Sequence, residues 1–286
     1  MKSYQRFEGW FQSFDSTKIY YQGWETQKPK LSIFFTHGQG EHSDCYHRVI
    51  EHFKGHGINF YGWDMRGHGR SEGLRGYANQ FQDYISDYQI FLDTLLKRAP
   101  SQKPVMLLAH SMGGLVQLSG LLERSQENFL GQILSAPLLG VAVNVPPVKK
   151  HGAELLSKFL PKLTLGNEVK NEMLTRDPDI MREFDKDTLR HGRISSGVYL
   201  GFLKQFEVVN ARAGEMKLPT LFVCPEKDPV VDTQATLQFE NQMGAENKKI
   251  ILYGQEAKHE MFNDLHRQDV YKDVESFIDS LLKEKT

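Results

Sequence analysis

A short apolar segment runs directly into a serine flanked by small residues and then into a helix-forming stretch. Residues 105–110 read Val-Met-Leu-Leu-Ala-His, the serine is Ser111, and Gly113 and Gly114 follow it. This pattern predicts a sharp turn from a buried strand into a helix, a nucleophile elbow, although Ala109 replaces the first glycine of the usual G-x-S-x-G. Because a serine hydroxyl is a weak nucleophile, it needs a position where a base can reach it. Ser111 is therefore the candidate nucleophile.

Two later strand-like segments end in polar loops that carry the partners such a serine requires. Residues 221–225 are apolar and lead to Asp228, and residues 249–253 lead to a loop with His259. His259 is the candidate base, and Asp228 is the candidate acid that orients the imidazole. The order serine, aspartate, histidine is that of α/β-hydrolases. Asp232, in contrast, precedes a helix-like stretch and is expected to be its N-cap.

A glycine-containing loop, His37-Gly38-Gln39-Gly40, follows another apolar strand at residues 31–36. Ester cleavage passes through an oxyanion that needs backbone N–H donors, and glycines let the backbone approach without obstruction. The expected oxyanion hole uses the N–H groups of Gln39 and Met112. An ordinary glycine-rich turn is the alternative interpretation of the loop.

Other site types fit the sequence less well. A phosphate-binding P-loop would need lysine and then serine or threonine after its last glycine, but Leu115 and Val116 stand there. Five histidines lie close together in the sequence: His37, His42, His47, His52 and His56. Only His52 and His56, four residues apart on a helix expected over residues 46–56, have a ligand spacing, and no third ligand follows. We therefore expect no metal, no cofactor, and solvent-exposed histidines on that helix face.

Together these motifs resemble the α/β-hydrolase superfamily and, within it, the monoacylglycerol lipase and lysophospholipase-like group of serine hydrolases. The resemblance implies an α/β fold with a mostly parallel central sheet, helices on both faces and an inserted helical cap. Four further blocks extend the resemblance over nearly the whole chain: residues 37–43 with Tyr46, residues 64–73, residues 109–114 and residues 176–191.

The chain departs from this group at two positions. An arginine that helps hold a glycerol end is replaced by Cys45, and a tyrosine sometimes found shortly before an Asp-Pro pair is replaced by Leu174. These changes indicate a different head-group preference. The candidate substrate-binding residues are Glu41, Cys45, His110, Leu138 and Val143. The last two belong to an apolar stretch, residues 138–148, that is expected to wall an acyl channel or to pack the cap onto the core.

The order of the expected elements defines the domain organisation. Strand and helix patterns alternate after an N-terminal antiparallel hairpin, which predicts a mostly parallel sheet. About 80 residues separate the strand near residue 132 from the one beginning at residue 220, far more than a single crossover helix requires. The predicted division is a core at residues 1–137, an inserted cap at 138–212 and a second core part at 213–286.

Composition limits the partners and the location. A net charge of −1 argues against nucleic acid, and two cysteines provide no disulfide framework. The N-terminus lacks the apolar region of a secretory signal, so a cytoplasmic location is expected. No apolar run is long enough to cross a bilayer, and membrane contact would be peripheral, through the cap residues Leu155, Leu156, Phe159 and Leu160.

The resulting functional prediction is a cofactor-free serine ester hydrolase that cleaves medium- or long-chain acyl monoesters, with monoacylglycerol as the preferred candidate substrate. A lysophospholipase or general carboxylesterase is the alternative, and an aminopeptidase using Glu41 for a free amine is a weaker one. Epoxide hydrolases and dehalogenases normally have aspartate at the elbow. A non-catalytic ligand-binding protein also stays open, although all three triad positions are filled. The sequence leaves the oligomeric state undetermined.

Overall fold

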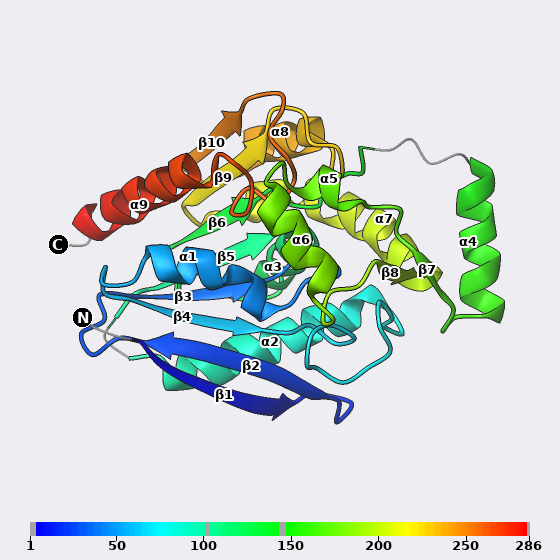
Figure 1. Ribbon diagram of the computed structural model, residues 1–286, viewed down its shortest axis with the longest axis horizontal. Coiled ribbons are helices and arrows are strands. Elements are labelled where there is room, and N and C mark those ends of the chain that lie inside the picture. Colours follow the sequence, from blue (N-terminus) through cyan, green and yellow to red (C-terminus); the bar gives the residue numbers. More distant parts are fainter. Residues whose placement is uncertain (1–3, 101–102, 143–146, 285–286) are drawn as a thin grey trace.

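An eight-stranded sheet forms the centre of the computed structural model, which describes residues 4–100, 103–142 and 147–284 (Figure 1). Its order is β1-β2-β4-β3-β5-β6-β9-β10. Both ladders made by β2 are antiparallel, and all the others are parallel. The strands are β1 Gln5–Gln12, β2 Lys18–Glu25, β3 Leu31–Thr36, β4 Ile58–Trp63, β5 Val105–His110, β6 Gly131–Ser135, β9 Thr220–Pro225 and β10 Lys248–Tyr253.

The parallel strands are apolar because helices cover both faces of the sheet. Every residue of β3, β4, β5, β6 and β9 is buried, as expected for strands covered on both faces. One hydrophobic cluster lies under three helices, α2 Phe81–Arg98, α3 Met112–Leu121 and α8 Thr233–Gln242. The other lies under α1 His47–His52 and α9 Arg267–Glu284. The predicted α/β-hydrolase fold and the N-terminal hairpin are confirmed.

A long insertion between β6 and β9, which we call the cap, lies over the carboxyl ends of the parallel strands (Figure 1). Its last helix packs back onto the core, where Val198, Phe202 and Val209 join the hydrophobic cluster. The exact cap boundaries, 138 and 212, stay a prediction. The elements of the cap are α4 Pro147–Phe159, β7 Thr164–Gly166, α5 Asn171–Leu174, α6 Pro178–Lys186, β8 Arg193–Ser195, α7 Ser196–Ala211 and the 3-10 turn η2 Ala213–Glu215.

The helix expected over residues 46–56 is shorter than predicted. A 3-10 turn, η1 Ser43–Tyr46, precedes α1, which ends at His52. Gly55 and Gly57 follow with φ of +93° and +77°, a left-handed backbone that stops the helix. The prediction that His52 and His56 share one helix face is therefore wrong, because His56 lies beyond the end of α1. His56 is exposed, as expected, whereas the half-buried His52 ring packs 4.5 Å from Tyr271.

None of the helices within the described ranges is long and apolar enough to cross a membrane. The cytoplasmic location stays a prediction. Both cysteines, Cys45 and Cys224, are free thiols.

A buried arginine joins the hairpin to the core. Arg66 donates to both carboxylate oxygens of Asp87 on α2, at 2.6 and 2.7 Å, and to Asp15 in the hairpin turn at 2.9 Å. Arg66 is 5% exposed and Asp87 is fully buried. A buried charge without its partner is costly, so this network fixes the loop after β4.

Replacing Arg66 with methionine should lower the free energy of unfolding by about 3–5 kcal/mol, because the carboxylate of Asp87 would stay buried without its cation. Urea denaturation of both proteins measures the difference. The matched control is Arg98→Met, which removes a half-exposed pair with Glu25 and should cost about 1 kcal/mol or less. Equal effects of the two substitutions would contradict this account of the network.

Candidate active site

Ser111 occupies a strained turn between β5 and α3. Its φ is +51° and its ψ is −122°, a backbone conformation that L-residues rarely adopt. Gly113 lets the turn pack closely, since a Cβ there would lie 2.5 Å from the carbonyl oxygens of Thr36 and His37. Such strain holds the serine side chain at the tip of the turn. The predicted elbow geometry is thus present.

The three predicted catalytic side chains form one hydrogen-bonded chain. The Nε2 atom of His259 lies 2.9 Å from the Oγ of Ser111, and its Nδ1 atom lies 2.8 Å from Oδ2 of Asp228. All three residues are buried. Each follows the carboxyl end of a strand, β5, β9 or β10, and these parallel strands bring the three loops to one edge of the sheet.

The surroundings shift the pKa values of Asp228 and His259 in the directions that proton transfer from Ser111 needs. Burial would raise the pKa of Asp228, but His259 and the backbone N–H groups of Val230 and Val231 hold it below its ordinary value. Burial would lower the pKa of His259, but the Asp228 carboxylate outweighs it and raises this pKa. The ionised Asp228 therefore favours an imidazole that accepts a proton from Ser111.

The glycine loop after β3 lies against the nucleophile. A Cβ on Gly38 would contact Cβ of Ser111 at 3.2 Å. The backbone N–H of Gly38 donates to Oε2 of Glu41 at 2.6 Å, which fixes the loop. Met112 is the first residue of α3, where backbone N–H groups have no acceptor within the helix. These positions are compatible with the predicted oxyanion hole of Gln39 and Met112.

A cavity of about 310 Å³ opens beside Ser111, between the core and the cap. Among the predicted substrate-binding residues, Glu41 and His110 line it. Cys45 lines two adjoining hollows instead. Leu138 packs into the hydrophobic core and is absent from the described wall of the cavity. Val143 lies outside the described residues.

The cap contributes polar groups to this cavity as well as apolar ones. The apolar side chains are Val169, Leu174 and Phe184, with Val230 from the core. The polar cap residues are Asn167, Asn171, Asp185, Asp187, Arg190 and His191. The wall is therefore more polar than the apolar channel that the sequence predicts for residues 138–148. That channel stays a prediction, because part of the stretch lies outside the described residues.

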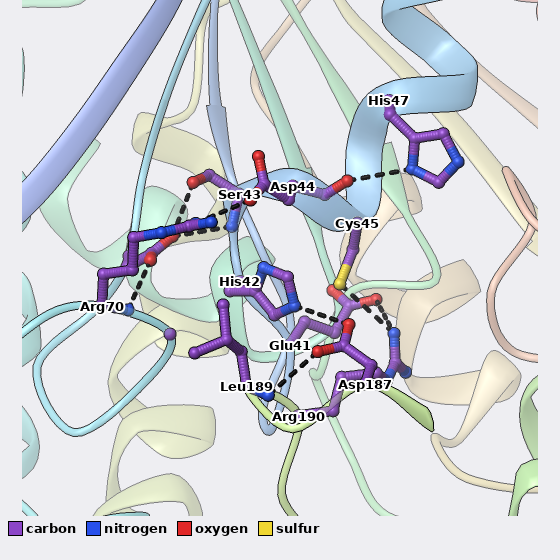
Figure 2. A network of polar contacts seen from close by, with 12 residues as sticks. Glu41, His42, Ser43, Asp44, Cys45, His47, Arg70, Asp187, Leu189 and Arg190 are labelled. Carbon is purple, nitrogen blue, oxygen red and sulfur yellow. Dashed lines mark hydrogen bonds and ion pairs between the residues drawn. The ribbon is translucent and has the colours of Figure 1, made fainter. Parts of the chain in front are cut away.

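Sequence reasoning missed a charged cluster in the wall of the cavity. Arg190 from the cap bonds to Glu260, the residue after His259, and its Nη1 lies 3.7 Å from Oε1 of Glu41. Figure 2 shows Arg190 also pointing to Cys45, whose Sγ lies 3.4 Å from Nη1. No local spacing relates these residues, because they come from three distant segments.

Three of the described side chains could together offer ligands to a metal ion: His42, Cys45 and Asp187, with donor atoms within 4.8 Å of one another. These donors are already engaged in protein contacts. His42 Nε2 lies 2.7 Å from Asp187, and Cys45 contacts the Arg190 guanidinium (Figure 2). Burial also raises the pKa of the Cys45 thiol. A guanidinium cation occupies the place beside the thiol that a metal would need.

The fold and this serine-centred site define the class of serine hydrolases with an α/β-hydrolase fold. The family model described as serine aminopeptidase, S33, matches residues 27–266, and the chain belongs to this family.

Named relatives narrow the group. The chain is 28% identical over 260 residues to phospholipase YtpA of Bacillus subtilis, covering 91% of this chain and 99% of the relative. It is 27% identical to a monoacylglycerol lipase of Mycolicibacterium smegmatis, covering 99% and 100%. A soluble variant of Saccharomyces cerevisiae monoglyceride lipase has the same fold, with a TM-score of 0.84, 20% identity and coverage of 96% and 94%. The predicted monoacylglycerol lipase-like group is confirmed.

Proposed function

We propose that the protein hydrolyses carboxylic esters through an acyl-serine intermediate formed on Ser111. The observation that carries this proposal is the continuous hydrogen-bonded chain from Ser111 through His259 to Asp228. Serine Oγ attacks the ester carbonyl carbon while its proton passes to Nε2 of His259. The negative charge that develops on the carbonyl oxygen is stabilised by the N–H groups of Gln39 and Met112.

The tetrahedral intermediate formed by this attack breaks down to the acyl-serine, which is then hydrolysed. The bond to the alcohol breaks, and the His259 imidazolium returns the proton to the departing oxygen. A water molecule next attacks the acyl carbon, gives its proton to His259, and the free acid leaves as Ser111 Oγ recovers that proton. Asp228 remains ionised throughout and holds the ring orientation.

The proposed substrate is a medium- or long-chain acyl monoester, with monoacylglycerol first and lysophospholipid second. The names of two similar proteins, a monoacylglycerol lipase and a phospholipase, support this class. The cavity supports it too, because apolar residues such as Leu174 and Phe184 lie beside polar ones such as Asn167 and Asn171. An ester with an acyl chain and a hydroxylated head group fits such a mixed wall.

An aminopeptidase activity is less well supported, despite the description of the family model. Glu41 would have to bind the free amine, but its carboxyl group already contacts Gly38, Tyr46 and Arg190. Burial raises the pKa of Glu41 to about 8, with Glu260 adding to the effect. A largely uncharged, occupied carboxyl group is a poor anchor for an ammonium ion.

A fluorophosphonate probe should label the protein, and Ser111→Ala should abolish both labelling and ester hydrolysis. Asp228→Asn should lower kcat by about 10⁴-fold, because the histidine would take the wrong tautomer. In-gel fluorescence and initial rates on p-nitrophenyl caprylate measure these effects.

Asp232→Asn is the matched control for the aspartate. Asp232 caps α8 through the N–H of Gln234 at 2.9 Å, so its replacement should leave kcat within about twofold and affect only stability. Labelling that persists in Ser111→Ala would disprove the assignment of the nucleophile.

Chain-length preference tests the substrate class. We expect kcat/KM for p-nitrophenyl caprylate to exceed that for the acetate by about tenfold or more, because each buried methylene adds binding energy. Release of fatty acid from monooleoylglycerol and from lysophosphatidylcholine then compares the two head groups. A steep preference for acetate would remove the lipase assignment and leave a general carboxylesterase.

The cap surface supports peripheral membrane contact as a further part of the proposal. Near the end of α4, Leu155, Phe159 and Leu160 are 51%, 70% and 55% exposed. Lys158 lies among them and is also exposed. Exposed apolar side chains beside a cation suit the interface of an anionic bilayer. Contact there would place the cap next to a lipid substrate.

The double variant Phe159→Ser/Leu160→Ser should weaken binding to phosphatidylglycerol-containing vesicles by about tenfold or more, because two apolar side chains no longer enter the interface. Vesicle co-sedimentation measures the bound fraction. Leu265→Ser is the control, since Leu265 is equally exposed, at 55%, but lies outside the cap. Unchanged binding of the double variant would rule out this surface as the contact.

A further inference from the structure

The cap is bonded to the loop that carries the catalytic histidine. The backbone N–H of His259 donates to the carbonyl oxygen of Met173 at 3.2 Å, and that of Glu260 donates to Leu174 at 2.9 Å. Arg176 adds a charged contact, with its Nη2 2.8 Å from Oδ2 of Asp264. The end of α5 therefore helps fix the position of the loop that carries His259.

A second cap segment is bonded to the oxyanion loop. The N–H of His191 donates to the carbonyl oxygen of Gly40 at 3.0 Å, and His42 lies 2.7 Å from Asp187. The backbones approach so closely that a Cβ on Gly40 would lie 2.1 Å from the His191 carbonyl oxygen. The side chain of Gln39 donates to the carbonyl oxygen of Arg193 at 2.6 Å. Residues 187–193 of the cap thus hold residues 39–42 in place through hydrogen bonds and close backbone packing.

Arg190 connects these two contacts between the cap and the core. It lies on the cap between α6 and β8, yet only 11% of its side chain is exposed. Its guanidinium stacks 3.8 Å from the Phe184 ring and contacts carboxyl groups of both core loops, Glu41 and Glu260. Glu41 holds the N–H of Gly38, and Glu260 directly follows His259.

We propose that Arg190 is a positioning residue of this serine hydrolase, which joins the oxyanion loop to the histidine loop and so completes the catalytic site when the cap is docked. The inference rests on the proposed function, because it concerns the same Ser111 reaction. Arg190 acts through Glu41 and Glu260 and is not itself a catalytic residue. It therefore affects every ester substrate alike, whatever the length of the acyl chain.

Charge explains why an arginine is needed at this position. Glu41 and Glu260 are both buried and face the same guanidinium. Arg190 and Asn263 outweigh the burial and hold the pKa of Glu260 below its ordinary range, so this carboxylate is ionised. Without Arg190 the ionised Glu260 would be left buried without a cation, and the loops that carry Glu260 and Glu41 would move apart.

The positive charge of Arg190 also affects the proposed catalytic base, His259. His259 faces Asp228, Ser111, the His110 ring at 4.7 Å, and the carboxyl groups of Glu260 and Glu41. Nearby negative charge stabilises the imidazolium, and Arg190 offsets part of it. Removing Arg190 should therefore raise the pKa of His259. Since His259 must be neutral to accept the serine proton, the acidic limb of activity should move to higher pH.

The test measures kcat/KM against pH for p-nitrophenyl acetate and caprylate with wild type, R190Q, R190K and R190Q/E260Q. R190Q should lose about 100-fold on both esters, as expected for misplaced catalytic groups. Its acidic limb should move up by about one pH unit. R190K should keep most of the activity, and R190Q/E260Q should return the limb toward its wild-type position because the unpaired carboxylate is gone.

Three results would overturn the proposal. In the first, R190Q behaves as wild type. In the second, R190Q raises KM for caprylate alone, which would make Arg190 a substrate-binding residue. In the third, R190Q loses activity while the acidic limb stays in place, which would mean a purely structural role. Thermal unfolding monitors folding. If R190Q does not fold, R190K and the charge-free pair R190Q/E260Q decide the question, the double variant being expected to fold because no buried charge is left unpaired.

Fluorophosphonate labelling separates this proposal from the proposed function. A wild-type protein that is neither labelled nor active would mean that the serine hydrolase assignment has failed. A labelled wild type together with an R190Q variant labelled at the same rate would mean that only the role of Arg190 has failed.

Discussion

The hydrogen bond between His259 and Ser111 is the interaction on which the whole arrangement depends. The two residues are 148 positions apart, and their atoms lie 2.9 Å from each other. Parallel strands achieve this because their carboxyl ends share one edge of the sheet. Five fully buried strands and the helices on both faces keep that edge rigid, and the strained turn at Ser111 directs the hydroxyl toward the imidazole.

The cap adds a second level of organisation. Its backbone bonds to the loops of His259 and Gly40, and its Arg190 contacts the carboxyl groups of Glu41 and Glu260 beneath them. A cap that only covered a cavity would need none of these contacts. In the proposed mechanism the catalytic groups come from the core, and Arg190 gives the insertion a part in their alignment. On this proposal the inserted segment affects reactivity as well as substrate choice.

The sequence was sufficient for the features that depend on local pattern. The elbow at Ser111, the strands before Asp228 and His259, and the N-cap at Asp232 each have a short-range signal, and the fold and group were predicted correctly. The end of α1 was missed because two glycines outweighed the helical pattern. Arg190 and Glu260 could not be found, since their cluster with Glu41 requires three distant segments to meet. Leu138 packs in the core, which is one of the two alternatives that the apolar stretch after β6 left open, and its role in substrate binding stays a prediction.

The most direct test of the central claim is the rate of fluorophosphonate reaction as a function of pH, with the adduct located by peptide mass spectrometry. The account predicts a single adduct on Ser111 whose rate of formation rises through one ionisation above the ordinary histidine value, because Asp228 raises the pKa of His259. An adduct on another residue, or a rate that does not change with pH, would contradict it.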